Sequence, residues 1–157
     1  MNTNTSSISQ STGRPDRLAG LTAVVDDLAT QDLHRLTDAA LAEQVLEMRR
    51  LVDRLEGHWL NDLAAVDARG AAGAEEGQPA DSTAGWLRNR LRMGAGTATS
   101  VVRTARALFR GPLTATAQAL TDGEISAAHA RVLADGIQNL PDHLIVEAEP
   151  VLVEAAS

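Results

Sequence analysis

Large apolar side chains recur every three or four residues over one long stretch of this chain. They are Leu41, Val45, Met48, Val52, Leu55, Trp59, Leu63 and Val66. This spacing follows one face of an α-helix and does not fit the period of two of a β-strand. Thr37 precedes the stretch as a helix N-cap, and Gly70 follows it, where glycine favours a helix end. The sequence therefore predicts one long helix over residues 38–69, with Gly57 inside it at a cost of about 1 kcal/mol relative to alanine.

The rest of the sequence also shows helical spacing and no strand pattern. Alanine and leucine dominate the apolar residues of the chain, which has one Phe, two Trp and no Tyr. This composition favours helices that pack closely through alanine-rich contacts. Further helices are expected at about 16–29, 82–92, 96–110, 113–121, 126–139 and 144–156. Pro150 is expected to kink or interrupt the last of these. We predict an all-α fold, a single domain of six or seven helices over residues 16–157, after a disordered tail at 1–15.

Catalytic and metal-binding patterns are missing from the sequence. There is no cysteine, and none of the four histidines forms a metal-ligand spacing with another. His129 is interpreted as a partly buried helix histidine, and Asp53 and Glu56 as surface acids. No phosphate-binding loop, dinucleotide fingerprint or nucleophile elbow is present. We therefore expect no enzyme activity and no cofactor.

No stretch reaches the roughly 18 apolar residues of a membrane span. The N-terminus is polar and lacks the hydrophobic run of a secretory signal. The sequence thus predicts a cytoplasmic protein without membrane contact.

A basic segment stands out in an acidic chain. Residues 81–110 hold six arginines and one acid, a net charge of +5, whereas the whole chain carries −7 and the remainder therefore −12. The segment reads as two short helices joined by a glycine-containing turn, which resembles a helix-turn-helix pair. Arg103, Arg106 and Arg110 follow one another at spacings of three and four, so they share one helical face.

This pair of helices suggests a nucleic-acid surface. Residues at the start of the second helix, Thr97 and Ser100, would approach bases. The phosphate contacts would come from Arg88, Arg92, Arg103, Arg106 and Arg110. The alternative is a solvated hairpin whose arginines pair with acids such as Asp62 or Glu124. The acidic remainder of the chain opposes DNA binding unless its charges lie on the far side.

Five phrases in series give the chain a family resemblance. They are Leu63-Ala-Ala-Val-Asp-Ala-Arg-Gly70, Ser82-Thr-Ala-Gly-Trp-Leu87, Val102-Arg-Thr-Ala-Arg-Ala-Leu108, the stretch from Asp122 to Leu133, and the stretch from Glu147 to Ala156. From about residue 35 to the end, the chain resembles the N-terminal region of actinobacterial 13E12-repeat proteins, known as domain of unknown function 222. A shorter likeness links residues 123–133 to helical parts of ParB-like partition proteins.

The resemblance implies a helical module that precedes a C-terminal HNH endonuclease domain. None of the nuclease motif positions occurs here, so no catalytic residue is carried over, and the nuclease module is expected to be absent from residues 16–157. The chain departs from the family pattern at Met93-Gly-Ala-Gly96, where a Ser-like cap and a proline are usual.

Two functional hypotheses follow from the sequence. The first is a non-catalytic, DNA-associated module of an HNH endonuclease-related protein. The alternative is a helical protein–protein interaction or dimerisation module that forms a homo-oligomer through the long helix and binds no nucleic acid. The apolar stripe of the long helix helps to distinguish them, because the interaction hypothesis loses its contact surface if the other helices cover this stripe.

Overall fold

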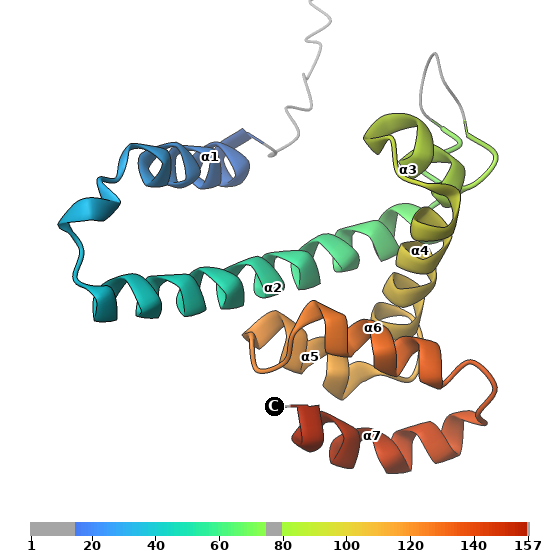
Figure 1. Cartoon of the computed structure of the whole chain (residues 1–157). Helices are drawn as coiled ribbons and strands as arrows, with labels where there is room; N and C mark the ends of the chain where they lie inside the picture. The colour runs from blue at the N-terminus through green and yellow to red at the C-terminus, as the bar shows by residue number, and fades with distance from the viewer. Residues whose placement is uncertain (1–14, 75–79, 157) are drawn as a thin grey trace, which may run out of the picture. The chain divides into compact units, whose positions relative to one another are not determined.

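The computed structural model describes residues 15–74 and 80–156, and these residues are helical with no strand (Figure 1), which confirms the all-α prediction. The helices are α1 (Pro15–Thr30), a 3₁₀ turn η1 (Leu33–Arg35), α2 (Asp38–Ala68), α3 (Thr83–Leu91), α4 (Ala95–Phe109), α5 (Thr114–Asp122), α6 (Ala127–Gly136) and α7 (Asp142–Ala156). By its internal contacts the chain divides into two units, residues 1–42 and 43–157, with α2 running through the boundary.

The described part of the first unit holds α1, η1 and the first turn of α2. Helix α1 begins at Pro15, where the fixed φ of proline suits a first helical position, and ends within one residue of the prediction. All its large apolar side chains are exposed: Leu18, Leu21, Val24, Val25 and Leu28. The Asp32 side chain caps η1 by accepting a 3.1 Å hydrogen bond from the His34 amide. Of the disordered tail predicted at residues 1–15, residues 1–14 lie outside the described residues, and Pro15 belongs to α1.

The long helix begins and ends as its sequence predicts. The Thr37 hydroxyl accepts a hydrogen bond from the Ala40 amide at 3.2 Å, the geometry of an N-cap. At the other end Gly70 has φ +62°, and two amides fold back on the helix, Gly70 to the Asp67 carbonyl and Ala71 to the Val66 carbonyl. This is a Schellman ending, which requires the left-handed conformation that glycine adopts without strain.

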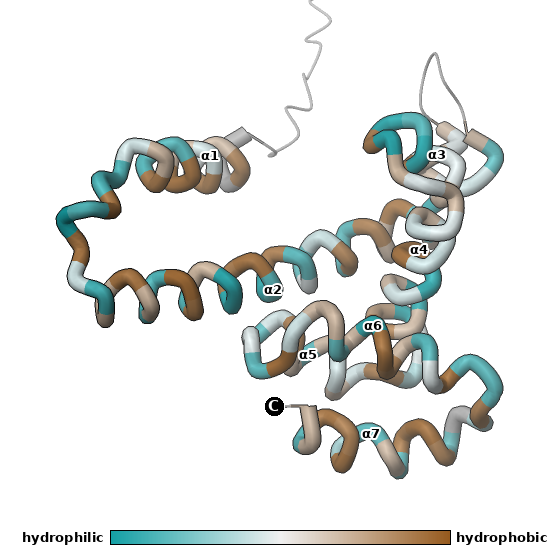
Figure 2. The backbone as a smooth tube through the Cα atoms, viewed as in Figure 1, coloured by the Kyte–Doolittle hydropathy of each residue, from teal (hydrophilic) through white to brown (hydrophobic). Residues whose placement is uncertain are grey.

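The buried face of α2 differs from the stripe that the spacing emphasises. The buried residues are Asp53, Gly57, Leu60, Leu63 and Ala64, all in the second half of the helix. Hydrophobic residues also recur along the first half (Figure 2), but there they are exposed apart from the half-buried Met48. The stripe reaches the core only at its end, through Leu63 and the half-buried Trp59, so the first half of α2 keeps its apolar face in solvent.

The core of the second unit gathers around α4. This helix packs against α3, α5 and α6, and α7 packs against α5. Six residues of α4 are buried, among them Val101, Val102 and Leu108, and Leu87 and Leu120 complete the tightest part of the core. Many of the other core residues are alanines, such as Ala98 and Ala130, which let the helices approach closely. Trp86 is half-buried against this core, as is Trp59.

The α3–α4 pair lies within one residue of its predicted bounds, but its turn is built differently. Ser82 caps α3 by accepting a hydrogen bond from the Gly85 amide at 3.1 Å. The left-handed residue of the turn is Arg92, with φ 54°, and not a glycine. Gly94 instead has φ −62° and serves as the N-cap of α4 without a side-chain hydrogen bond.

The last helices differ from prediction at two places. Helix α6 begins within one residue of the prediction, after Ser126, whose hydroxyl accepts a hydrogen bond from the His129 amide, but it ends at Gly136 instead of residue 139. Helix α7 continues through Pro150, so the proline does not interrupt it. Proline removes only the hydrogen bond to the carbonyl one turn earlier, at Val146, and that residue is exposed to water.

Candidate functional site

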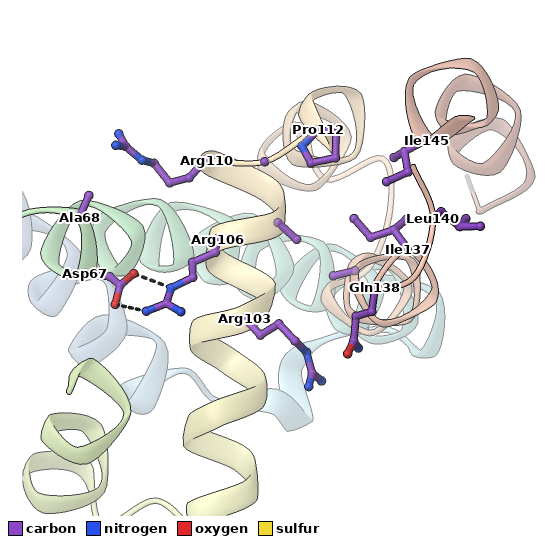
Figure 3. A pocket seen from close by; sticks show the side chains of 13 residues that line it. Asp67, Ala68, Arg103, Arg106, Arg110, Pro112, Ile137, Gln138, Leu140 and Ile145 are labelled. Atoms are coloured by element: carbon purple, nitrogen blue, oxygen red, sulfur yellow. Dashed lines mark hydrogen bonds and ion pairs between the residues drawn. The ribbon is translucent and has the colours of Figure 1, made fainter. Parts of the chain in front are cut away.

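The arginines predicted to bind phosphates fall into two groups. Arg106 and Arg110 project from α4 toward Asp67 and Ala68 of α2, whereas Arg103 projects to the other side of the helix, toward Gln138 (Figure 3), so the single arginine face that the spacing predicts is divided. Arg88 and Arg92 are exposed at the end of α3 and do not line the same hollow. At the start of α4, Thr97 is exposed and Ser100 is half-buried.

Arg106 is held by an acid of α2. Its Nε and Nη2 donate to the two carboxylate oxygens of Asp67 at 2.6 and 2.8 Å, a bidentate pair. The Thr83 hydroxyl donates to the same carboxylate at 2.7 Å. The hydrogen bonds from Arg106 lower the pKa of Asp67 most, against an opposing effect of burial, and Thr83 lowers it further. Asp67 in turn raises the pKa of Arg106.

Arg103 is paired as well, on the other side of α4. Its Nη2 lies 2.6 Å from the Asp135 carboxylate of α6 and 3.4 Å from the Ser100 hydroxyl, and its buried Nε has no hydrogen-bond partner. The arginines thus pair with acids of neighbouring helices, as the alternative hypothesis expected, but with Asp67 and Asp135 rather than with Asp62 and Glu124. Phosphate contact by Arg103 and Arg106 remains a prediction, and it would have to compete with these pairs.

The three α4 arginines border one hollow of about 540 Å³. Asp67 and Ala68 of α2 lie on the side of Arg106 and Arg110, whereas Ile137, Leu140 and Ile145 lie on the opposite side (Figure 3). The hollow is therefore polarised, with a cationic side and an apolar side.

Asp53 is not the surface acid that the sequence suggests, and that interpretation is wrong. It is buried, with 5% of its surface exposed, and its carboxylate accepts hydrogen bonds from Arg49 at 2.6 and 2.8 Å and from the Ala127 amide at 2.9 Å. The Arg49 hydrogen bonds lower the pKa of Asp53 more than burial raises it, and the Ala127 amide lowers it further. Asp53 thereby supplies negative charge at the start of α6, where the helix dipole favours it.

A sequence signal for this role existed. Asp53 shares a helix face with Gly57, Leu60 and Ala64 at spacings of four, three and four, and this face is the buried one. Glu56, next to it, pairs with Arg131 of α6 at 3.2 Å. All four charged groups that border the 390 Å³ hollow at this place are thus paired with one another.

The exposed apolar surface of α2 is the second candidate site. Val45, Met48, Val52 and Leu55, flanked by Leu51, form what we call the α2 stripe. Except for the half-buried Met48, these residues are 44–61% exposed. Among the described residues of the second unit, 43–74 and 80–156, no helix covers these side chains, and such an exposed surface is what the interaction hypothesis requires.

The described residues hold neither a metal-binding cluster nor a membrane-spanning helix. Within residues 15–74 and 80–156, no three His, Cys, Asp or Glu side chains are grouped so that they could hold a metal ion. His129 is exposed rather than partly buried, because the first turn of α6 points its side chain outward. In the described part of the chain, no helix combines the length and the apolar character needed to cross a membrane.

Comparison with known proteins gives one match. No curated protein and no solved structure is significantly similar to the chain. A family model matches residues 38–152, which include α2 through most of α7 and thus both candidate sites. The chain therefore belongs to the family described as Domain of unknown function (DUF222).

Proposed function

We propose that the chain is a non-catalytic helical module that self-associates through the α2 stripe. The observation that carries this proposal is the exposure of Val45, Val52 and Leu55 at 44–61% on a helix whose large apolar residues alternate at spacings of four and three from Leu41 to Trp59. Such spacing is the pattern with which two helices pack as a coiled coil. Single exposed apolar residues are ordinary, but a contiguous stripe of them marks a contact surface.

A second copy of the chain is the partner that the stripe fits best. Two identical stripes can form a two-fold symmetric contact, in which every pair of contacting residues occurs twice. In an antiparallel pair, Val45 of one copy lies opposite Leu55 of the other, and Met48 lies opposite Val52. In this register position 47 of one copy lies opposite position 53 of the other, which brings Glu47 next to Arg54 of the second copy.

The mass of the full chain in solution tests this proposal. We expect a dimer in light scattering and sedimentation at micromolar concentration, and a monomer for Val45→Glu/Val52→Glu, because each glutamate would be desolvated in the contact. Val132→Glu is the matched control, since Val132 is 69% exposed on α6, away from the stripe, and this variant should remain dimeric. A wild-type chain that stays monomeric to high micromolar concentration, or a Val132→Glu variant that dissociates equally, would reject the proposal.

The resemblance to HNH endonuclease-associated proteins suggests what self-association would achieve. In an HNH endonuclease-related protein of the cytoplasm, a self-associating module would hold two nuclease domains together, and the chemistry would belong to those domains.

DNA association is the second candidate function, and the free arginines favour it. Arg88, Arg92 and Arg110 are exposed, and the described part of the chain shows no acid paired with any of them. They need not break an existing ion pair to meet a phosphate, unlike Arg103 and Arg106. Thr97, exposed in the first turn of α4, would lie nearest the bases if that helix entered a groove.

A salt titration of DNA affinity tests this second candidate. Each phosphate neutralised contributes about 0.9 to the slope of log affinity against log salt, so Arg88→Ala/Arg92→Ala/Arg110→Ala should reduce the slope by about 2–3. Thr97→Ala should change sequence preference with little change in slope. Absence of binding at low salt, or an unchanged slope in the triple variant, would remove DNA association.

A further inference from the structure

The hollow beside α4 is lined by the combination of apolar and charged side chains that is typical of a ligand site. Its volume of about 540 Å³ lies in the range of small-molecule sites in proteins. One side carries Arg106, Arg110 and Asp67, a net charge of +1 (Figure 3). The other side is formed mainly by Pro112, Ile137, Leu140 and Ile145, with Arg103 beside Gln138 at its edge. Such sites combine apolar walls with a few fixed polar groups that orient the ligand.

The arginines of the hollow differ in what they can offer a ligand. Arg106 is bidentately bound to Asp67, and Arg103 is bound to Asp135 through one nitrogen. These pairs hold the two side chains in place at the edge of the hollow. Arg110 has no acid partner in the described part of the chain, so its five N–H donors are open to an incoming anion. The excess positive charge of this side is thus concentrated at Arg110.

The apolar side is also incompletely covered. Ile145 is buried and forms part of the core, Ile137 is half-buried, and Leu140 is 49% exposed. Arg110 and these residues lie on opposite sides of α4 in the view of Figure 3, so a ligand that uses both must span the hollow.

From this arrangement we infer that the hollow binds a small organic anion with an apolar tail, such as a medium-chain carboxylate or a monoalkyl phosphate. Its head group would take charge-assisted hydrogen bonds from Arg110, and its tail would cover Leu140 and Ile137. This site is independent of the α2 stripe and of self-association.

Calorimetric titration of the full chain with a matched series of probes tests the inference. Octanoate and octyl phosphate, kept below micelle formation, should bind, whereas octylamine, octanol and inorganic phosphate should not. The first pair shares an anionic head and an apolar tail, and each of the others lacks one of these two. Equal binding of all octyl compounds would show only apolar association, binding of inorganic phosphate alone would show only anion capture, and either result would overturn the inference, as would no binding at all.

Three variants then locate the site. Arg110→Ala should weaken octanoate binding about tenfold, the size of one lost charge-assisted hydrogen bond. Leu140→Asp should weaken it as well, by placing a charge against the tail. Arg50→Ala is the control, since Arg50 is an exposed arginine of α2 that does not line the hollow, and its affinity should stay unchanged. Equal effects of Arg50→Ala and Arg110→Ala, at unchanged melting temperatures, would place the ligand elsewhere.

Discussion

Asp67 connects three helices of the second unit through one carboxylate. It belongs to α2 and receives hydrogen bonds from Arg106 of α4 and from Thr83 of α3. Its side chain is only 14% exposed, so water cannot easily replace these donors. A carboxylate with several donors in a partly buried place is stabilised in its charged form, which is why its pKa is lowered.

This lowered pKa predicts an acid-dependent contribution to stability. A carboxyl group whose folded pKa is depressed stabilises the fold above its unfolded value of about 3.9, and this stabilisation is lost as the pH falls through the folded pKa. Asp67→Asn should therefore be less stable than the wild type by about 1–2 kcal/mol at pH 7, with the difference shrinking below pH 4. Urea unfolding at several pH values measures it, with the exposed Asp62→Asn as control. A difference that is the same at pH 7 and at pH 2 would contradict the electrostatic origin.

At the residue scale the sequence predicted that α4 carries these arginines but not where each one points. The spacing of Arg103, Arg106 and Arg110 predicts one helical face, but Arg106 and Arg110 point toward α2 whereas Arg103 points to the other side of α4. Their pairing with Asp135 and Asp67 depends on where α6 and α2 lie, and the local sequence carries no sign of this. The burial of Asp53 could be inferred from its spacing with Gly57, Leu60 and Ala64, but its partner, the Ala127 amide of another helix, could not.

Among the elements, α2 and α5 approach each other at a glycine. A Cβ atom on Gly57 would lie 3.1 Å from Leu120 Cγ and 3.1 Å from Thr121 Cγ2. Leu120 is completely buried, so it has little room to move. The helix-propensity cost of Gly57 is therefore offset by the close packing that the missing side chain permits.

Filling this contact should destabilise the fold. We expect Gly57→Val to lower the free energy of unfolding by about 2 kcal/mol, because extra carbon atoms in a packed core force neighbours out of place. Gly96→Ala is the control in α4, where an added Cβ meets nothing within 4 Å, and it should be neutral or slightly stabilising. Chemical denaturation of both variants gives the comparison. A Gly57→Val variant as stable as the wild type would show that α5 can shift away at no cost.

Helix bounds were the most predictable feature at this scale. Thr37, Ser82 and Ser126 all act as caps, and Gly70 ends α2, because these signals are local. Which face of α2 is buried was less predictable. Its longest apolar stripe is exposed over the first half, and the buried face instead uses small and polar residues such as Gly57 and Asp53.

On the scale of the whole molecule, the second unit depends on a buried acid near the chain end. Glu149 of α7 is 4% exposed and accepts hydrogen bonds from the Thr116 amide at 2.7 Å and the Thr116 hydroxyl at 2.8 Å. Helix α5 has no cap of its own, because its N-cap residue is Leu113. Glu149 takes that place and so joins α7 to the rest of the unit.

Removal of this carboxylate should loosen α7. We expect Glu149→Leu to cost about 1–3 kcal/mol, because the amide and hydroxyl of the fully buried Thr116 lose their acceptor. The exposed Glu147→Leu on the same helix serves as control and should change stability little. Hydrogen exchange of α5 and α7 amides, with thermal melting, distinguishes local loosening from global loss. Unchanged exchange in α5 would mean that Glu149 does not cap that helix in solution.

The caps contributed by distant residues also bear on how the protein matures during synthesis. The Asp53–Ala127 bond closes 74 residues and the Thr116–Glu149 bond closes 33, but the acid comes first in one pair and last in the other. Asp53, which caps α6, has already been synthesised when α6 leaves the ribosome. Glu149, which caps α5, is synthesised only after α5, so α5 stays uncapped until the chain has been extended past Glu149. We therefore expect α6 to settle against α2 while translation is still under way, and α5 to gain its final rigidity only near the end of synthesis.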